Sequence, residues 1–249
     1  MRHVTLLEEL EAYRPWNDQE ERDRAELLRR LRSGEALYTR DNAAGHLTAS
    51  AWVVSPDRTQ VLMAYHNLYD SWSWLGGHAD GDRDLLAVSM REVREESGLT
   101  AVRPVSPHIY SLEILTVDGH EKRGAYVSSH LHLNVTYLLE ADPAAPVRRK
   151  PDENSAVAWF GLEEAVAASS EPWFRERIYP KLIEKAKRFP PRSSALSGSL
   201  SSEGDEQQRG KASSDGGKGK VVRQPQQPGG NRPRPVEKLG QLHAEGNRK

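Results

Sequence analysis

The glycine pair Gly76-Gly77 marks the change of pattern that most restricts how this chain folds. Before it, the segments LTASAWVVS and VLMAYH are short runs of apolar and β-branched residues, which are typical of strands. After it, a polar loop leads into a helical pattern from about Asp84 to Ser97, and Gly98 is a natural helix stop. The sequence therefore predicts a strand, a close glycine turn and an amphipathic helix in succession.

Three glutamates crowd one face of this expected helix near its C-terminal end: Glu92, Glu95 and Glu96. Like charges at this spacing destabilise a bare helix, and the helix dipole disfavours negative charge there. Ion pairs with Arg91 and Arg94 would offset part of this repulsion, and a bound divalent cation would offset more. The loop before the helix adds three aspartates: Asp80, Asp82 and Asp84. Clustered oxygen atoms beside flexible glycines favour the cation, because Mg²⁺ prefers oxygen ligands.

From Gly77 to Leu99 the sequence resembles the Nudix box. That pattern is Gly, five residues, Glu, seven residues, then Arg-Glu-aliphatic-any-Glu-Glu-any-Gly-aliphatic. The nine residues from Arg91 to Leu99 match it throughout, and Gly77 stands at the correct distance before them. One position departs, because Arg83 occupies the place of the first Glu, which is a supporting metal ligand in the family. The departure bears on the number of bound ions, and either flanking aspartate is a candidate substitute.

The resemblance implies a fold of the α/β class, an α/β/α sandwich around a mixed β-sheet, and a metal-dependent hydrolase. It also implies that Mg²⁺ or Mn²⁺ is held by the Gly77 carbonyl and by Glu92, Glu95 and Glu96. Glu92 is either the general base or a further ligand, because family members differ on which carboxylate activates water. Arg91 would orient Glu92 through a charge-assisted hydrogen bond.

Two residues near this motif are further candidates. Glu153 lies in a loop where Nudix enzymes often place an extra Glu as base or metal ligand, and the alternative is an exposed loop acid. His78 directly follows the glycines, where it would contact a substrate phosphate or serve as a structural hydrogen-bonding group.

A second polar pattern follows later in the chain, where His130, His132 and Asn134 alternate with apolar residues and so share one strand face. This face is a candidate lining of the substrate cleft, with His132 as a substrate contact. A His-X-His pair also suits Zn²⁺ or another transition metal, although the sequence offers no convincing third ligand. Ordinary hydrogen-bonded histidines are the third interpretation.

The remaining patterns predict two opening helices, a hairpin, a short strand and two closing helices. The expected ranges are Thr5 to Tyr13, Glu20 to Arg32, His108 to Val117 with Gly124 to Glu140, Val157 to Phe160, Leu162 to Ala168 and Trp173 to Arg188. We expect the hairpin turn at Asp118-Gly119-His120 and a buried stripe of Leu86, Met90 and Val93 on the acidic helix. Trp72 and Trp74 share a strand face, where packing is favoured over stacking on a base.

Composition divides the 249-residue chain into three parts: an N-terminal helical segment at 1–45, the hydrolase domain at 46–189 and a disordered low-complexity tail at 190–249. The tail has no Phe, Trp or Tyr, and its 11 Lys and Arg against 6 Asp and Glu are scattered, which argues against nucleic acid as a partner. No stretch is apolar enough for a signal peptide or a membrane span, so we expect a cytoplasmic protein.

The leading hypothesis is a hydrolase that cleaves the diphosphate linkage of a small nucleotide or other diphosphate by water attack at phosphorus. The alternative is a catalytically inactive module of the same fold, silenced by Arg83, that binds nucleotide or protein. An isoprenoid diphosphate isomerase of the same superfamily is disfavoured, because those enzymes rely on a cysteine and this chain has none. The opening helices are compatible with a homodimer surface or with covering a sheet edge.

Overall fold

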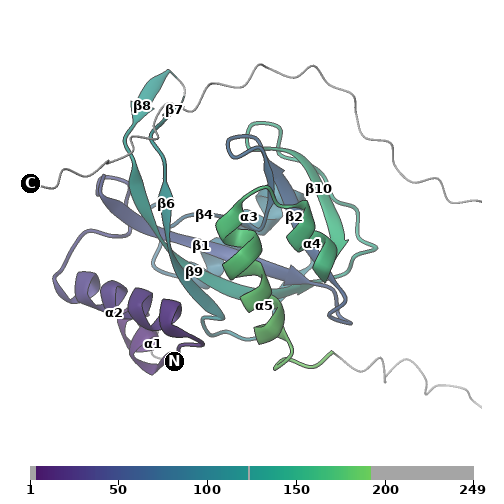
Figure 1. The fold of residues 1–249 in the computed structure, drawn as a ribbon, viewed down its shortest axis with the longest axis horizontal. Coiled ribbons are helices and arrows are strands. Elements are labelled where there is room, and N and C mark those ends of the chain that lie inside the picture. The colour runs from purple at the N-terminus through teal and green to yellow at the C-terminus, as the bar shows by residue number, and fades with distance from the viewer. Residues whose placement is uncertain (1–3, 123, 192–249) are drawn as a thin grey trace, which may run out of the picture. The chain divides into compact units, whose positions relative to one another are not determined.

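The computed structural model describes residues 4–122 and 124–191, and the predicted tail lies outside them from residue 192 onward. Its centre is a mixed eight-stranded sheet in the order β10-β2-β1-β9-β5, with β3 paired to β2, β4 to β1 and β6 to β9 (Figure 1). Strands β1 and β9 run parallel, and the other pairs are antiparallel. The strands are β1 Gly45–Val54, β2 Gln60–His66, β3 Ser71–Ser73, β4 Leu75–His78, β5 Val102–Pro104, β6 Ser111–Val117, β9 His130–Ala141 and β10 Asn154–Gly161.

Helices cover both faces of this sheet. They are α1 Leu6–Ala12, α2 Asp18–Arg32, α3 Leu85–Ser97, α4 Leu162–Ala168, the π-helix η1 Phe174–Ile178 and α5 Tyr179–Ala186. Alternate residues of β1 belong to different cores, since Ala51 packs in the cluster with α1, α2 and α3, while Trp52 packs with α4, η1 and α5. The α/β/α sandwich expected from the sequence is therefore confirmed, and α4 and α5 lie over one face (Figure 1).

The acidic helix forms where the sequence predicted it. Asp84 is its N-cap, because the Asp84 side chain accepts a hydrogen bond from the Ala87 N–H at 3.0 Å, and Gly98 ends it with φ at 73°. The predicted buried stripe is only partly correct. Val93 is fully buried, but Leu86 and Met90 are only half-buried at the margin of the core. The face of α3 that packs most deeply against the sheet is formed by a different set of residues. That buried face comprises Leu85, Val88, Ser89, Val93, Glu96 and Ser97.

The predicted hairpin is present, but its turn is not at residues 118–120. Strands β6 and β9 pair from Val117 opposite His130, and the connection between them forms a separate two-stranded ribbon. The ribbon consists of β7 His120–Lys122 and β8 Ala125–Val127. The sequence prediction merged β8 with β9 because both are apolar and β-branched in pattern. In addition, the helix expected from Trp173 to Arg188 divides into η1 and α5.

The N-terminal helices cover a sheet edge. The Gln19 side-chain amide donates to the Leu112 carbonyl oxygen at 3.1 Å, and the Asp23 carboxylate accepts from the Ile114 N–H at 2.9 Å. Both contacts fall on the backbone of β6, so side chains of α2 occupy hydrogen-bonding groups that an edge strand would otherwise expose. Of the two roles compatible with the sequence, these contacts support the covering of an edge.

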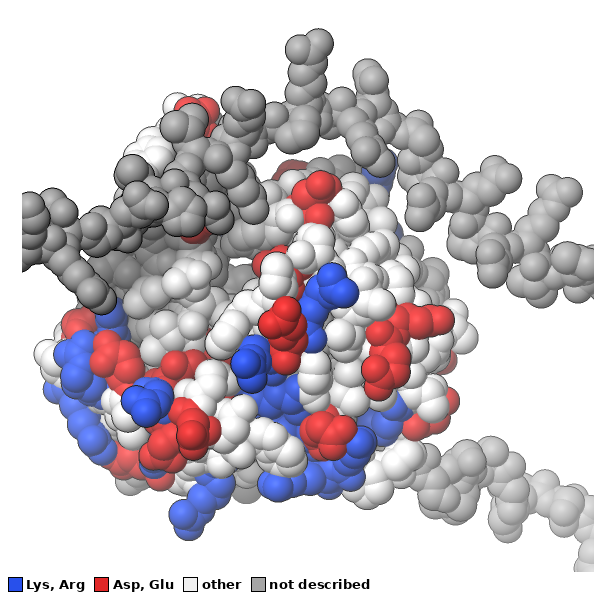
Figure 2. Space-filling model, in the orientation of Figure 1, with Lys and Arg blue, Asp and Glu red and all other residues white. Residues whose placement is uncertain are grey.

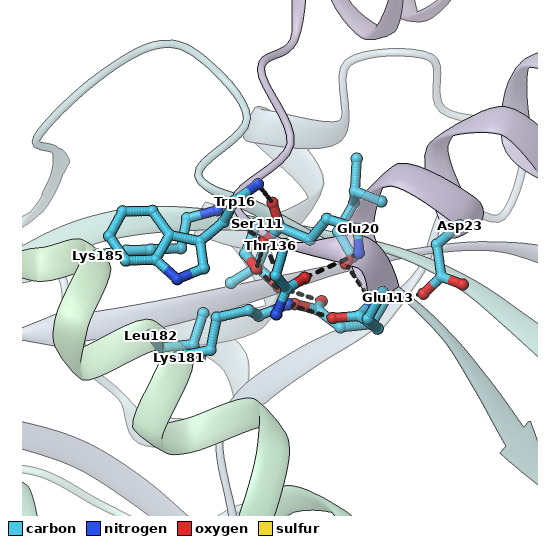
Figure 3. A network of polar contacts seen from close by, with 12 residues as sticks. Trp16, Glu20, Asp23, Ser111, Glu113, Thr136, Lys181, Leu182 and Lys185 are labelled. Carbon is cyan, nitrogen blue, oxygen red and sulfur yellow. Dashed lines mark hydrogen bonds and ion pairs between the residues drawn. The ribbon is translucent and has the colours of Figure 1, made fainter.

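A buried ionic network joins α2, β6 and α5 (Figure 3). The Lys181 Nζ lies 2.8 Å from Glu113 and 3.1 Å from Glu20, and the Lys185 Nζ lies 2.7 Å from Glu20. Tyr13 adds a hydroxyl that donates to Glu20 at 2.6 Å. Burial by itself would lower the pKa of Lys181, but Glu113 and Glu20 raise that pKa overall. The network therefore holds the N-terminal helices and the last helix against the same sheet.

We expect Lys181→Met to lower the free energy of unfolding by about 3–5 kcal/mol at pH 7, because it leaves a buried carboxylate without its partner. Urea denaturation followed by circular dichroism measures the change. Lys187→Met is the matched control, since the Lys187 side chain is 66% exposed in its pair with Glu184, and it should shift stability by less than about 0.5 kcal/mol. A loss below about 1 kcal/mol for Lys181→Met would show that the network contributes little.

Candidate active site

The glycine pair brings the end of β4 into direct contact with α3. A Cβ atom added to Gly77 would lie 2.5 Å from the Glu92 Cδ, and one added to Gly76 would lie 2.6 Å from the Ser50 Oγ. The Gly76 N–H donates to the Glu96 carboxylate at 3.1 Å. At Gly76 a Cβ would also meet the backbone of Ala49 and Ser50, and at Gly77 it would displace the Glu92 carboxylate, so these two glycines form a cradle of backbone beside two carboxylates.

Both carboxylates in the cradle are held in an environment that disfavours their charge. Burial raises the pKa of Glu96 to about 8, with Glu92 and Glu153 acting in the same direction. Burial and the neighbouring Glu95 raise the pKa of Glu92, while Arg91 opposes them. A divalent cation between these groups would reverse the effect, because it stabilises the charged form of each. The residues present therefore fit a hard cation.

The loop before β10 completes the acidic cluster. The Lys150 Nζ lies 3.1 Å from both the Glu95 and the Glu153 carboxylates, so the ammonium group of Lys150 bridges these two acids. The Asn154 side chain is buried and donates to the Glu96 carbonyl oxygen at 3.0 Å, which attaches this loop to the end of α3. The structure thus brings Glu153 beside the helix acids. Asn154 was missed by the sequence analysis, because only the packing of β10 against α3 reveals its role.

The arginines and aspartates of the box have separate partners. The Arg91 guanidinium lies 3.3 Å from Glu92 and 3.4 Å from Asp82, consistent with an orienting role. Arg83 stacks on the Tyr38 ring, 4.7 Å from its centroid, and Arg40 forms two hydrogen bonds with Asp80. Of the two aspartates that flank Arg83, Asp84 caps α3 and Asp82 lies 3.4 Å from the Arg91 guanidinium.

The histidines converge beside the cradle. His78 and His132 have ring centroids 4.8 Å apart, and His46 lies 5.0 Å from His78 and 5.4 Å from His132. His130 follows at 4.9 Å from His46. Burial lowers the pKa of His132 to about 2, and it also lowers the pKa of His46, so both rings are neutral at pH 7. His46 was missed by the sequence analysis, although it is the third histidine that the His-X-His pattern lacked.

The third polar residue of the predicted strand face has a different role. Asn134 is 1% exposed and accepts hydrogen bonds from Thr48 and Ser50, each at 2.9 Å, while its amide donates to Glu113 at 3.1 Å. It is therefore part of the buried polar layer between β1, β6 and β9.

Other candidates and surfaces are explained by packing. Trp72 contacts Phe160 edge to face at 4.8 Å, and Trp74 contacts Phe174 in the same way at 5.4 Å, so both indoles belong to the core side of the sheet. Acidic and basic side chains intermingle over α1 and α2, as Figure 2 shows, with ion pairs such as Glu26 with Arg29. Within residues 4–122 and 124–191, no helix combines the length and apolarity needed to cross a membrane.

The chain is similar to known proteins. A family model described as the NUDIX domain matches residues 45–182. Similar solved structures include an Ap4A hydrolase from C. elegans, with 17% identity over 57% of this chain and 96% of that chain and a TM-score of 0.38. A NUDIX family hydrolase from Clostridium perfringens is also similar, with 20% identity over 57% of this chain and 97% of that chain and a TM-score of 0.41. A dihydroneopterin triphosphate pyrophosphohydrolase from E. coli has 16% identity over 55% of this chain and 95% of that chain, with a TM-score of 0.42. No curated protein matches the chain significantly.

The pKa of Glu96 generates a prediction about stability in cation-free buffer. Its folded pKa of about 8 lies above the ordinary value of 4.5, so the folded protein keeps a proton that the unfolded chain releases between these pH values. Stability is therefore lost as the pH rises from about 4.5 to 8. We expect Glu96→Gln to have nearly the stability of the wild type at pH 5 and to be more stable than the wild type by several kcal/mol at pH 9, since each pKa unit corresponds to about 1.4 kcal/mol.

Urea denaturation in the presence of a chelator, at both pH values, measures this difference. Glu163→Gln on α4 is the control, because its side chain is exposed and the substitution should leave the pH dependence unchanged. Parallel stability curves for the wild type and Glu96→Gln would contradict the placement of a strained, buried charge at Glu96.

Proposed function

The chain belongs to the NUDIX domain family and is a hydrolase of that family, and on this premise we propose that it cleaves a diphosphate linkage with Mg²⁺ or Mn²⁺. The proposed substrate is a nucleoside diphosphate joined to a further group, and water attacks phosphorus. The observation that carries the proposal is the packing of Glu92 and Glu96 against the Gly76-Gly77 backbone, with Glu153 near enough to raise both their pKa values.

The proposed metal ligands are the Gly77 carbonyl and the carboxylates of Glu92, Glu95 and Glu96. When bound, the cation neutralises phosphate oxygens and lowers the pKa of a coordinated water. Glu96 is the most rigid of these side chains, because it is buried and accepts from the Gly76 N–H. Glu95 is 46% exposed and pairs with Lys150, so it exchanges that partner on binding a cation.

Two carboxylates are candidates for the general base. Glu92 is 13% exposed and is oriented by Arg91 at 3.3 Å, which fixes the direction of its lone pairs. Glu153 shares the Lys150 ammonium with Glu95 and is 40% exposed, so water reaches it directly. His78 and His132 are proposed to contact the substrate, because His78 follows Gly77 on β4 and its ring lies 4.8 Å from that of His132.

A panel of nucleotide diphosphate derivatives assayed with Mg²⁺ and Mn²⁺ tests the proposal, with chromatographic detection of the nucleoside monophosphate product as the readout. We expect chelation to abolish hydrolysis. Loss of the base lowers kcat by about 10²–10⁴-fold even at saturating Mn²⁺. Loss of a ligand instead raises the Mn²⁺ concentration needed for half-maximal activity. Glu92→Gln and Glu153→Gln are therefore compared over a Mn²⁺ titration, and Glu163→Gln is the matched control.

The outcomes separate the alternatives. A variant whose activity recovers at high Mn²⁺ has lost a ligand, and one that does not recover has lost the base. Stabilisation against heat by a compound of the panel, with no hydrolysis product formed from any of them, would instead support a binding module. Equal rates for the wild type and both glutamine variants would overturn the assignment of the site.

Arg83 is the observation that favours the inactive alternative, since it replaces the first box glutamate. Its guanidinium stacks on the ring of Tyr38, which precedes β1. We therefore propose that Arg83 holds the N-terminal segment against the loop before α3 and takes no part in hydrolysis. We expect Arg83→Ala to lower the free energy of unfolding by about 0.5–1 kcal/mol and to change kcat less than about twofold. A large loss of activity with unchanged stability would assign Arg83 to the substrate site instead.

A further inference from the structure

Three histidines from two parallel strands form a compact set beside the carboxylate site. His46 lies near the start of β1, and His130 and His132 lie at the start of β9, because the register places His46 directly opposite His132. One ring nitrogen from each histidine lies within 4.8 Å of the others. Among the described residues, no other group of three or more histidine or acidic side chains meets this criterion.

The unpaired nitrogen of His46 is the most informative atom of the set. His46 is 5% exposed, and its Nε2 is buried without a hydrogen-bond partner. Its Nδ1 lies 3.2 Å from the Asn42 carbonyl oxygen. Since a carbonyl only accepts, Nδ1 must carry the proton, and Nε2 of the neutral ring presents a lone pair. A buried acceptor left unpaired is unfavourable unless a ligand satisfies it.

His130 is prepared in the same way. Its Nδ1 lies 2.8 Å from the Ser128 carbonyl oxygen, which again places the proton on Nδ1 and leaves a lone pair on Nε2. A backbone carbonyl in this position is the usual partner that orients a metal-binding histidine. The Nε2 atoms of His130 and His132 are 3.3 Å apart. Two nitrogens bound to one tetrahedral Zn²⁺ at about 2.0–2.1 Å are separated by about 3.3 Å.

We propose that His46, His130 and His132 bind a divalent transition-metal ion of the Zn²⁺ type. Three imidazole nitrogens suit Zn²⁺ and its neighbours in the first transition series, whereas Mg²⁺ prefers the oxygen ligands of the carboxylate site. Three protein ligands leave the fourth tetrahedral position open for water or a substrate oxygen. His130 and His132 are only half-buried, so an ion reaches the set from solvent.

The test uses the full chain after metal removal, titrated with Zn²⁺ in a calorimeter. Millimolar Mg²⁺ is present throughout to occupy the carboxylate site, because Mg²⁺ does not compete for imidazole. We expect one Zn²⁺ per chain, and we expect the ion to raise the melting temperature of the wild type. The same titration with Co²⁺ reports the ligand geometry, because tetrahedral nitrogen coordination gives intense visible absorption bands.

Two ligand variants and one matched control decide the result. Because His46→Gln changes a buried residue, His130→Gln is the second variant, and each should weaken Zn²⁺ binding by at least about 100-fold. His120→Gln is the control, since its ring centroid is 6.4 Å from that of His130 and it lies outside the set, so it should bind like the wild type.

Glu92→Gln separates this site from the proposed hydrolytic one. We expect Glu92→Gln to bind Zn²⁺ unchanged in Mg²⁺ buffer even if it is inactive, because binding and hydrolysis use different donors. The proposal would be overturned by a wild type without saturable Zn²⁺ binding, or by unchanged affinity in a folded His130→Gln. It would equally be overturned if Glu92→Gln abolished the binding of Zn²⁺.

Discussion

The absence of side chains at Gly76 and Gly77 is the constraint on which the site depends. It allows β4 to approach α3 so closely that any Cβ at these positions would overlap Glu92 or β1. The approach also buries Glu96 against a backbone N–H and moves the carboxylates of one helix turn out of water. Their raised pKa values follow from this burial and from mutual repulsion. On a solvent-exposed acidic helix the carboxylates would stay hydrated, and a cation would stabilise their charged forms much less.

The segment before the sheet is structurally continuous with the rest of the described protein. Leu10 and Leu27 belong to the same core cluster as the sheet residues, and Glu20 enters the buried ionic network with α5. Arg40 binds Asp80 in the loop before α3, so this segment also holds the loop that leads into the acidic helix. The replacement of a box glutamate by Arg83 is explained in the same way, since Arg83 packs on Tyr38.

Two sets of donors with different chemistry lie on either side of Gly77. The carboxylates of α3 face the glycine itself, while His78 leads to the histidines at the starts of β1 and β9. Oxygen and imidazole donors select different ions, so their proximity need not cause competition. The alternation of side chains along β4 explains why the two donor sets are separate. Gly77 and His78 are consecutive residues, so positions 77 and 78 face opposite sides of the sheet.

The sequence by itself determined the parts of the molecule that depend on short-range spacing. The start of α3 near Asp84, its stop at Gly98 and the grouping of Glu92, Glu95 and Glu96 were all predicted from spacing within a few turns. Most of the order of strands and helices was likewise visible from apolar periodicity, but β5 was not predicted. The ribbon inserted between β6 and β9 was not, because its apolar residues continue the pattern of the strand that follows.

Tertiary structure decided what depends on register and on contacts between distant segments. The parallel pairing of β1 with β9 places His46 opposite His132, and nothing in the local sequence of His46 indicates that neighbour. Packing likewise assigned Asn134 to a buried polar layer and attached the Glu153 loop to α3 through Asn154. The physical reason is that helix spacing is fixed by bonds along the chain, whereas strand register is fixed by which faces the whole core buries.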